Sequence, residues 1–103
     1  MRISETERQQ IIYAAVEHFG AWVRVVLFGS RVRDEARGGD LDLLIDVTRG
    51  RGISYADAEK RKITFLVDLK RRIGDRKIDV VIRTADSVQR PIDRVADREG
   101  VPL

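Results

Sequence analysis

Three aspartates are spaced so that their carboxylates can meet and hold a cation. Asp40 and Asp42 stand two residues apart at the start of "DLDLLIDV", and Asp79 stands inside "KIDVVI". Residues two apart on a β-strand share a face, so Asp79 can join the pair if the two segments are neighbouring strands. Convergent carboxylates repel one another without a cation, and hard cations such as Mg²⁺ prefer oxygen ligands. The spacing therefore predicts a Mg²⁺ site.

A Gly-Ser pair upstream of the aspartates supplies groups that suit phosphate. Gly29 and Ser30 follow the apolar run "WVRVVLF", and Arg31 comes next. Glycine lets a ligand approach the backbone closely, and a serine hydroxyl with an amide N–H at a helix start is a favourable place for phosphate oxygens. The Arg31 guanidinium can neutralise phosphate charge. The two segments together predict a phosphate-binding turn that faces a metal-binding group of carboxylates.

Short helices and strands must position these residues. The capping box of Ser4 with Glu7 and the N-cap Ser54 mark two helix starts, and Pro91 suits the first turn of a third. The predicted helices cover 4–19, 55–73 and 91–99, with a short helical turn at about 31–36. The predicted strands cover 22–28, 40–47 and 77–82. We expect residues 1–103 to form a single domain of α/β (α+β) class, with a mixed sheet of three to four strands flanked by helices.

Composition limits the classes of function. The formal charge of +3 and the pI near 9.7 invite a nucleic-acid interpretation, but acidic and basic residues interleave along the chain, so we discount nucleic acid as a direct ligand. No stretch is apolar enough to span a membrane, and the N-terminus lacks the apolar region of a signal peptide. The absence of cysteine fits a reducing cytoplasm, which is the expected location.

Two further ionisable residues have simpler interpretations. Asp46 shares the strand face of Asp40 and Asp42 but lies at the far end of the segment, where we expect it to be exposed to solvent and not catalytic. His18 stands alone late in the first helix, which favours a surface or helix-end position over a ligand role.

The motif "GSRVRDEARGGDLD" followed by "IDVVI" resembles the nucleotidyltransferase superfamily of the DNA polymerase beta type, most closely its minimal nucleotidyltransferase domains. The resemblance covers nearly the whole chain and implies the small nucleotidyltransferase fold. It implies that Asp40, Asp42 and Asp79 are the catalytic metal ligands, holding two Mg²⁺ ions together with the phosphates of ATP. It also implies that Gly29, Ser30 and Arg31 bind the nucleotide.

The same resemblance suggests an acceptor. Minimal nucleotidyltransferases of this type resemble antitoxins that are paired with a HEPN-type ribonuclease toxin, which they silence by AMPylation: AMP passes from ATP to a toxin tyrosine. This implies a toxin–antitoxin system, a HEPN-type protein partner and an oligomer formed with it. Two alternatives stay open. One is a catalytically idle fold that neutralises its partner by binding only, and the other is a small basic nucleic-acid-binding domain.

Overall fold

Four strands and three helices make up the protein in the computed structural model, which describes residues 3–29, 40–50 and 52–103. In chain order the elements are α1 (Glu5–Phe19), β1 (Arg24–Phe28), β2 (Leu41–Asp46), α2 (Tyr55–Ile73), β3 (Ile78–Arg83), α3 (Pro91–Glu99) and β4 (Val101–Pro102). The order confirms the predicted class, a small α+β fold with a mixed four-stranded sheet. The expected helical turn at 31–36 lies outside the described residues.

The helices begin where local capping predicts. Ser4 Oγ accepts from the N–H of Glu7, and Glu7 Oε1 accepts from the N–H of Ser4, both at 3.0 Å, which confirms the capping box of α1. Ser54 Oγ accepts from the N–H of Asp57 at 3.1 Å and starts α2. These bonds satisfy orphan N–H groups within a few residues of chain, so they can be predicted without knowledge of the tertiary structure.

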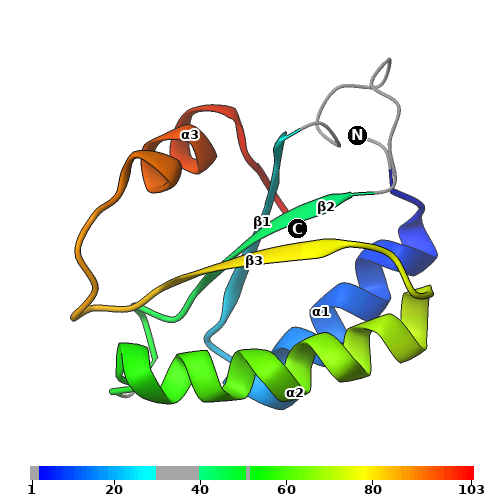
Figure 1. The fold of residues 1–103 in the computed structure, drawn as a ribbon, viewed down its shortest axis with the longest axis horizontal. Coiled ribbons are helices and arrows are strands. Elements are labelled where there is room, and N and C mark those ends of the chain that lie inside the picture. Colours follow the sequence, from blue (N-terminus) through cyan, green and yellow to red (C-terminus); the bar gives the residue numbers. More distant parts are fainter. Residues whose placement is uncertain (1–2, 30–39, 51) are drawn as a thin grey trace.

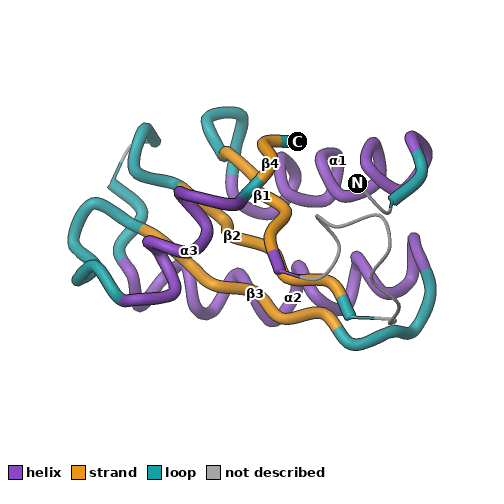
Figure 2. Tube along the Cα trace, turned by 90° about the horizontal axis from the view of Figure 1, so that it is seen from above, coloured by secondary structure: helices purple, strands orange, loops and turns teal. Residues whose placement is uncertain are grey.

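The sheet has the strand order β3-β2-β1-β4. β1 pairs with β2 and with β4 in antiparallel fashion, whereas β2 and β3 are parallel and are joined through α2. Figure 1 shows the sheet between α3 on one side and α1 with α2 on the other, and Figure 2 shows the strands from above, with β3 at one border of the sheet.

The two faces of the sheet carry cores of different size. Under α1 and α2 lies the main core, which confirms that one set of alternating β2 side chains points to this layer. These side chains are Leu41, Leu43 and Ile45, followed by Val47 beyond the strand end. Under α3 lies a smaller cluster of Phe28, Leu44 and Ala96, with Val26 and Val81 packed against it. The α3 side of the sheet, which we call the acid face, therefore carries the even-numbered residues of β2.

Two strand predictions need correction. β1 begins at Arg24 and not at Trp22, because Trp22 lies in the turn after α1 and is 68% exposed. β4 was not predicted, because its two residues show no strand periodicity and become a strand only by pairing with Val26 and Leu27 of β1. None of the helices in the described ranges combines the length and the apolar character needed to cross a membrane.

Candidate functional site

Asp42 and Asp79 lie opposite each other on neighbouring strands. The register of β2 and β3 pairs Leu41 with Ile78 and Asp42 with Asp79. Because Leu41 and Ile78 both belong to the main core under the helices, the two aspartates project from the acid face. Asp40 directly precedes β2 and is exposed. The structure thus brings Asp42 and Asp79 together with Asp40 beside them, and we call this group the acid end.

The carboxylates of the acid end influence one another electrostatically. The pKa of Asp42 is raised above its ordinary value, first because the side chain is partly buried and then because the negative charges of Asp79 and Asp40 disfavour ionisation. Contact with the Asp79 carboxyl acts in the same direction. The positive charge of Lys77 acts in the opposite direction. Among the described residues, burial and the repulsion from Asp79 and Asp40 outweigh this charge, so the pKa of Asp42 stays raised.

Gly29 brings the end of β1 against the Asp42 carboxylate. Its φ is +77°, a left-handed conformation that favours glycine, and a Cβ atom there would collide with Oδ2 of Asp42 and lie 3.0 Å from its Cγ. Phe28, the residue before it, is paired with Asp42 in the β1–β2 register. The predicted phosphate-binding glycine and the predicted metal ligand are therefore direct neighbours. Ser30 and Arg31, the other predicted nucleotide-binding residues, lie outside the described residues.

Sequence reasoning did not single out Lys77 as part of this site. Its carbonyl accepts from the N–H of Leu41 at 3.0 Å, so the β2–β3 ladder extends to Lys77. Lys77 stands two residues before Asp79 and shares its parity, which was a signal available in the sequence. A basic residue at this border can offset the charge of the carboxylates or of a phosphate.

The donor set of the acid end fits a hard divalent cation. Carboxylate oxygens are the ligands that Mg²⁺ prefers, and here they stand on adjacent strands, where burial and then mutual repulsion raise the pKa of Asp42. A bound cation would remove the repulsion. The fit rests on the residues themselves, and the roles of Asp40, Asp42 and Asp79 as ligands stay a prediction.

At the other end of the acid face lies Asp46, whose place in the sequence predicts exposure to solvent. The residue is not exposed but only 7% accessible, because Arg83 of β3 lies opposite it in register and places Nη1 3.6 Å from Oδ2. Thr48 donates to Asp46 Oδ1 from its N–H at 2.9 Å and from its hydroxyl at 2.6 Å. Asp46 therefore has a structural role, with its carboxylate bonded to Thr48 and paired with Arg83.

Arg83 and Arg90 together neutralise Asp93 of α3, which is 1% accessible. Arg83 Nε lies 3.6 Å from Asp93 Oδ1, and Arg90 donates to Oδ2 from its backbone N–H at 2.8 Å and from Nε at 3.2 Å. Arg83 also reaches Asp97 at 3.0 Å. Burial alone would raise the pKa of Asp93, but Arg90 and Arg83 hold it below its ordinary value. We call Asp46, Arg83, Arg90 and Asp93 the arginine end.

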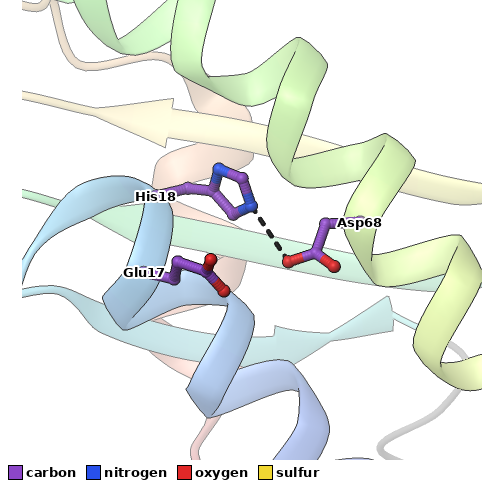
Figure 3. A group of neighbouring side chains, drawn as sticks. All are labelled: Glu17, His18 and Asp68. Atoms are coloured by element: carbon purple, nitrogen blue, oxygen red, sulfur yellow. Dashed lines mark hydrogen bonds and ion pairs between the residues drawn. The ribbon is translucent and has the colours of Figure 1, made fainter.

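A third group of ionisable residues lies between the helices and not on the acid face. Figure 3 shows Glu17 and His18 of α1 beside Asp68 of α2, with His18 Nε2 3.0 Å from Asp68 Oδ2. Arg72 bonds the remaining oxygen of Asp68 at 3.1 Å and Glu17 at 3.0 Å. Both acids already have cationic or hydrogen-bonding partners, so this group is an ion-pair network that joins α1 to α2. His18 has the helix-end position that the sequence predicted, with Asp68 as a partner that it did not.

Comparison with known families identifies a match over most of the chain. A family model described as a nucleotidyltransferase domain matches residues 9–99, a range that contains β1, the acid end and α3. None of the curated proteins matches the chain.

Proposed function

The chain belongs to the nucleotidyltransferase domain family of the DNA polymerase beta type, and from this premise we propose that it transfers AMP from ATP to a tyrosine of a HEPN-type toxin and so acts as an antitoxin. Nucleotidyl transfer in general follows from the family. The choice of ATP, of a protein hydroxyl and of a toxin partner is our proposal. A cytoplasmic location and assembly with the partner belong to the same proposal.

The observation that carries the proposal is the in-register pair of Asp42 and Asp79 beside Gly29. A catalytically idle fold has no need for carboxylates that repel each other, because the repulsion disfavours the folded state. Retaining them is expected where a cation and a triphosphate bind. This favours the enzyme over an antitoxin that acts by binding only.

The residues with a proposed role in the reaction lie on, or directly beside, three neighbouring strands, β1, β2 and β3. Asp40, Asp42 and Asp79 would hold Mg²⁺, which when bound neutralises phosphate charge and the charge that develops on the leaving oxygen. Gly29, with no side chain, lets the Asp42 carboxylate lie directly against the end of β1. Gly29, Ser30 and Arg31 would contact the phosphates. Asp79 would orient the acceptor hydroxyl and take its proton.

Each bond change can then be assigned. The acceptor oxygen bonds to the α-phosphorus, the bond from that phosphorus to the bridging oxygen breaks, and pyrophosphate leaves. The proton of the acceptor hydroxyl moves to the Asp79 carboxylate. AMP remains on the acceptor oxygen.

A macromolecular acceptor suits the size of the protein. A domain with one four-stranded sheet that devotes one end of a sheet face to ATP has little of that face left for a second small-molecule pocket. A partner protein can bring its own surface and present a hydroxyl to the acid end. The remaining alternative, a basic nucleic-acid-binding domain, does not explain why acidic residues converge.

The deciding experiment is intact-mass analysis of the partner. The protein is co-expressed with a HEPN-type partner, purified and incubated with ATP and Mg²⁺, and we expect the partner to gain the mass of an adenylyl group on tyrosine. Asp42→Asn should abolish the gain, because removing a metal ligand withdraws several kcal/mol of transition-state stabilisation.

The matched control is Asp75→Asn. Asp75 lies just before β3, its side chain is 94% exposed, and the substitution makes the same change of charge outside the acid end. It should leave transfer unchanged. A partner that is silenced without any gain of mass, by the parent and by Asp42→Asn alike, would replace the enzyme by the binding-only antitoxin.

A further inference from the structure

β3 is an edge strand, and its hydrogen-bonding pattern shows which backbone groups face outward. Among the residues that the structure describes, β3 pairs with β2 alone. The carbonyls of Lys77 and Arg83 accept from the N–H groups of Leu41 and Val47 at 3.0 and 2.9 Å. Backbone groups alternate in direction along a strand, so the odd-numbered residues of β3 bond to β2. The N–H and C=O groups of Ile78, Val80 and Ile82 therefore point away from the sheet.

Only one end of this edge is covered within the described ranges. Arg90 donates to the carbonyl of Ile82 at 2.5 Å, which closes the edge near the arginine end. Within the same described ranges, neither backbone nor side chain bonds to the N–H or C=O of Ile78 or Val80. An uncovered edge of this kind is a template for an added strand. The open part of the edge is the part next to Asp79.

The strand order places Gly29 and the residues of the acid end in order across the sheet, from β1 to the free edge of β3. Gly29 follows β1, Asp42 lies on β2 and Asp79 lies on β3, so the residues run from the phosphate side to the free edge. Figure 2 shows β3 at the border of the sheet opposite β4. An acceptor that approaches from the free edge meets Asp79 first, and the nucleotide phosphates on the side of Gly29 lie beyond.

We propose that the acceptor is an extended peptide segment that adds to the open edge of β3 as a new strand, beside Ile78 and Val80, and presents its hydroxyl side chain next to Asp79. This inference rests on the proposed function and specifies how the acceptor binds. Side chains that face each other on adjacent strands have Cβ atoms about 5 Å apart. A hydroxyl side chain on the acid face of the added strand therefore comes within reach of the Asp79 carboxylate, which takes its proton as the oxygen bonds to the α-phosphorus.

Edge pairing predicts a specific dependence on the acceptor backbone. The probe is a short synthetic peptide of alternating threonine and valine with one central tyrosine. Two derivatives carry N-methyl groups on one or the other alternate set of backbone nitrogens, so they have the same composition and charge. Only one set faces β3 in a paired strand. With ATP and Mg²⁺, one derivative should accept AMP about tenfold more slowly than the other, because it loses the edge hydrogen bonds.

A substitution tests the same edge from the side of the protein. Val80→Pro removes an N–H that points outward and leaves every N–H that bonds to β2. Val80→Thr is the matched control, because it also changes a half-buried side chain but keeps the N–H. We expect Val80→Pro to slow transfer to the peptide by about tenfold and to leave the thermal shift produced by Mg²⁺ with ATP unchanged. Val80→Thr should behave as the parent protein in both assays.

The outcomes separate this inference from the proposed function. Equal rates for the two methylated peptides, or for Val80→Pro and Val80→Thr, would overturn edge docking while adenylyl transfer stands. A peptide that stays unmodified while the HEPN-type partner gains mass would overturn it as well, as would transfer of AMP to an RNA oligonucleotide instead of the peptide. If neither peptide nor partner is modified, the proposed function fails and this inference fails with it. Because the methylated peptides leave the protein unaltered, the test stands even if Val80→Pro does not fold.

Discussion

At one end of the acid face Asp42 lies opposite Asp79, and at the other end, four residues along the same strands, Asp46 lies opposite Arg83. Both positions hold an aspartate of β2 on the same face of the sheet. At the arginine end the buried carboxylates meet guanidinium groups, and the pKa of Asp93 is lowered. At the acid end an aspartate meets an aspartate, and the pKa of Asp42 is raised.

The different partners of the aspartates at the two ends distinguish carboxylates that stabilise the fold from carboxylates that are available to a ligand. The arginine end binds α3 to the sheet through charges that the chain supplies itself. At the acid end, no lysine or arginine within the described ranges forms an ion pair with Asp42 or Asp79. An external cation can therefore complete the acid end, whereas the arginine end is complete already. Removing the charge of an aspartate should consequently change stability in opposite directions at the two ends.

The largest effect is expected for Asp93→Asn at the arginine end. The substitution leaves Arg83 and Arg90 partly buried with their common carboxylate removed, and we expect a loss of about 3 kcal/mol in the free energy of unfolding. Urea denaturation measures it. Asp97→Asn is the control, because Asp97 is an exposed partner of Arg83 and its loss should cost less than about 1 kcal/mol.

The same variant has a defined pH dependence. The pKa of Asp93 is lowered in the folded state, so its stabilisation is present above the ordinary value of 3.8 and is lost as the pH falls through the folded-state pKa. The difference between parent and Asp93→Asn should be constant near neutrality and shrink below pH 3.8. A difference that grows on acidification would contradict the assignment of Asp93 as an ionised partner of the arginines.

Gly29→Ala should give the second largest effect and tests the close approach at the acid end. The new side chain would combine a left-handed backbone with a collision against the Asp42 carboxylate, and we expect a loss of about 2 kcal/mol. Gly52→Ala is the matched control, because Gly52 has a φ of +61° with nothing within 4 Å of an added Cβ, and it should cost about 1 kcal/mol. Equal losses in thermal denaturation would show that the contact with Asp42 contributes nothing.

Asp46→Ala should have a smaller effect, although Asp46 shares the strand and face of Asp42. The variant loses two hydrogen bonds from Thr48 and an ion pair with Arg83 but leaves Arg83 its contacts with α3. We expect a loss of about 1 kcal/mol. The response of the melting temperature to Mg²⁺ with ATP should be the same as in the parent. A lost response would extend the cation site to the arginine end and break the comparison.

The smallest effect, and the only one of opposite sign, is expected for Asp42→Asn. The substitution removes repulsion with Asp79 and Asp40, so the melting temperature without cation should equal that of the parent or exceed it by a few degrees at neutral pH. Because the pKa of Asp42 is raised in the folded state, this advantage should vanish below the ordinary value of 3.8, where the parent carboxyl is protonated. Mg²⁺ with ATP should stabilise the parent and not the variant. Equal shifts for both proteins would remove the cation site.

The sequence by itself determined the local features and the composition of the candidate site. The capping bonds of Ser4 and Ser54 join residues three apart, so the sequence contains both partners. Alternation along β2 placed Asp40 and Asp42 on one face and Leu41 and Leu43 on the other without reference to any neighbour. The family motif likewise lies in the order and spacing of residues, and the family match covers 9–99.

Only the tertiary structure decided which charges meet. The parallel register of β2 and β3 places Asp79 against Asp42 and, four residues on, Arg83 against Asp46, which sequence reasoning had left exposed to solvent. The pairing of β4 with β1, and the pairing of His18 with Asp68 across two helices, arise in the same way. A side chain's direction is a property of its own strand, but its electrostatic environment depends on residues far away in the chain. That is why two aspartates of one strand, alike in the sequence, end as a ligand candidate and a structural ion pair.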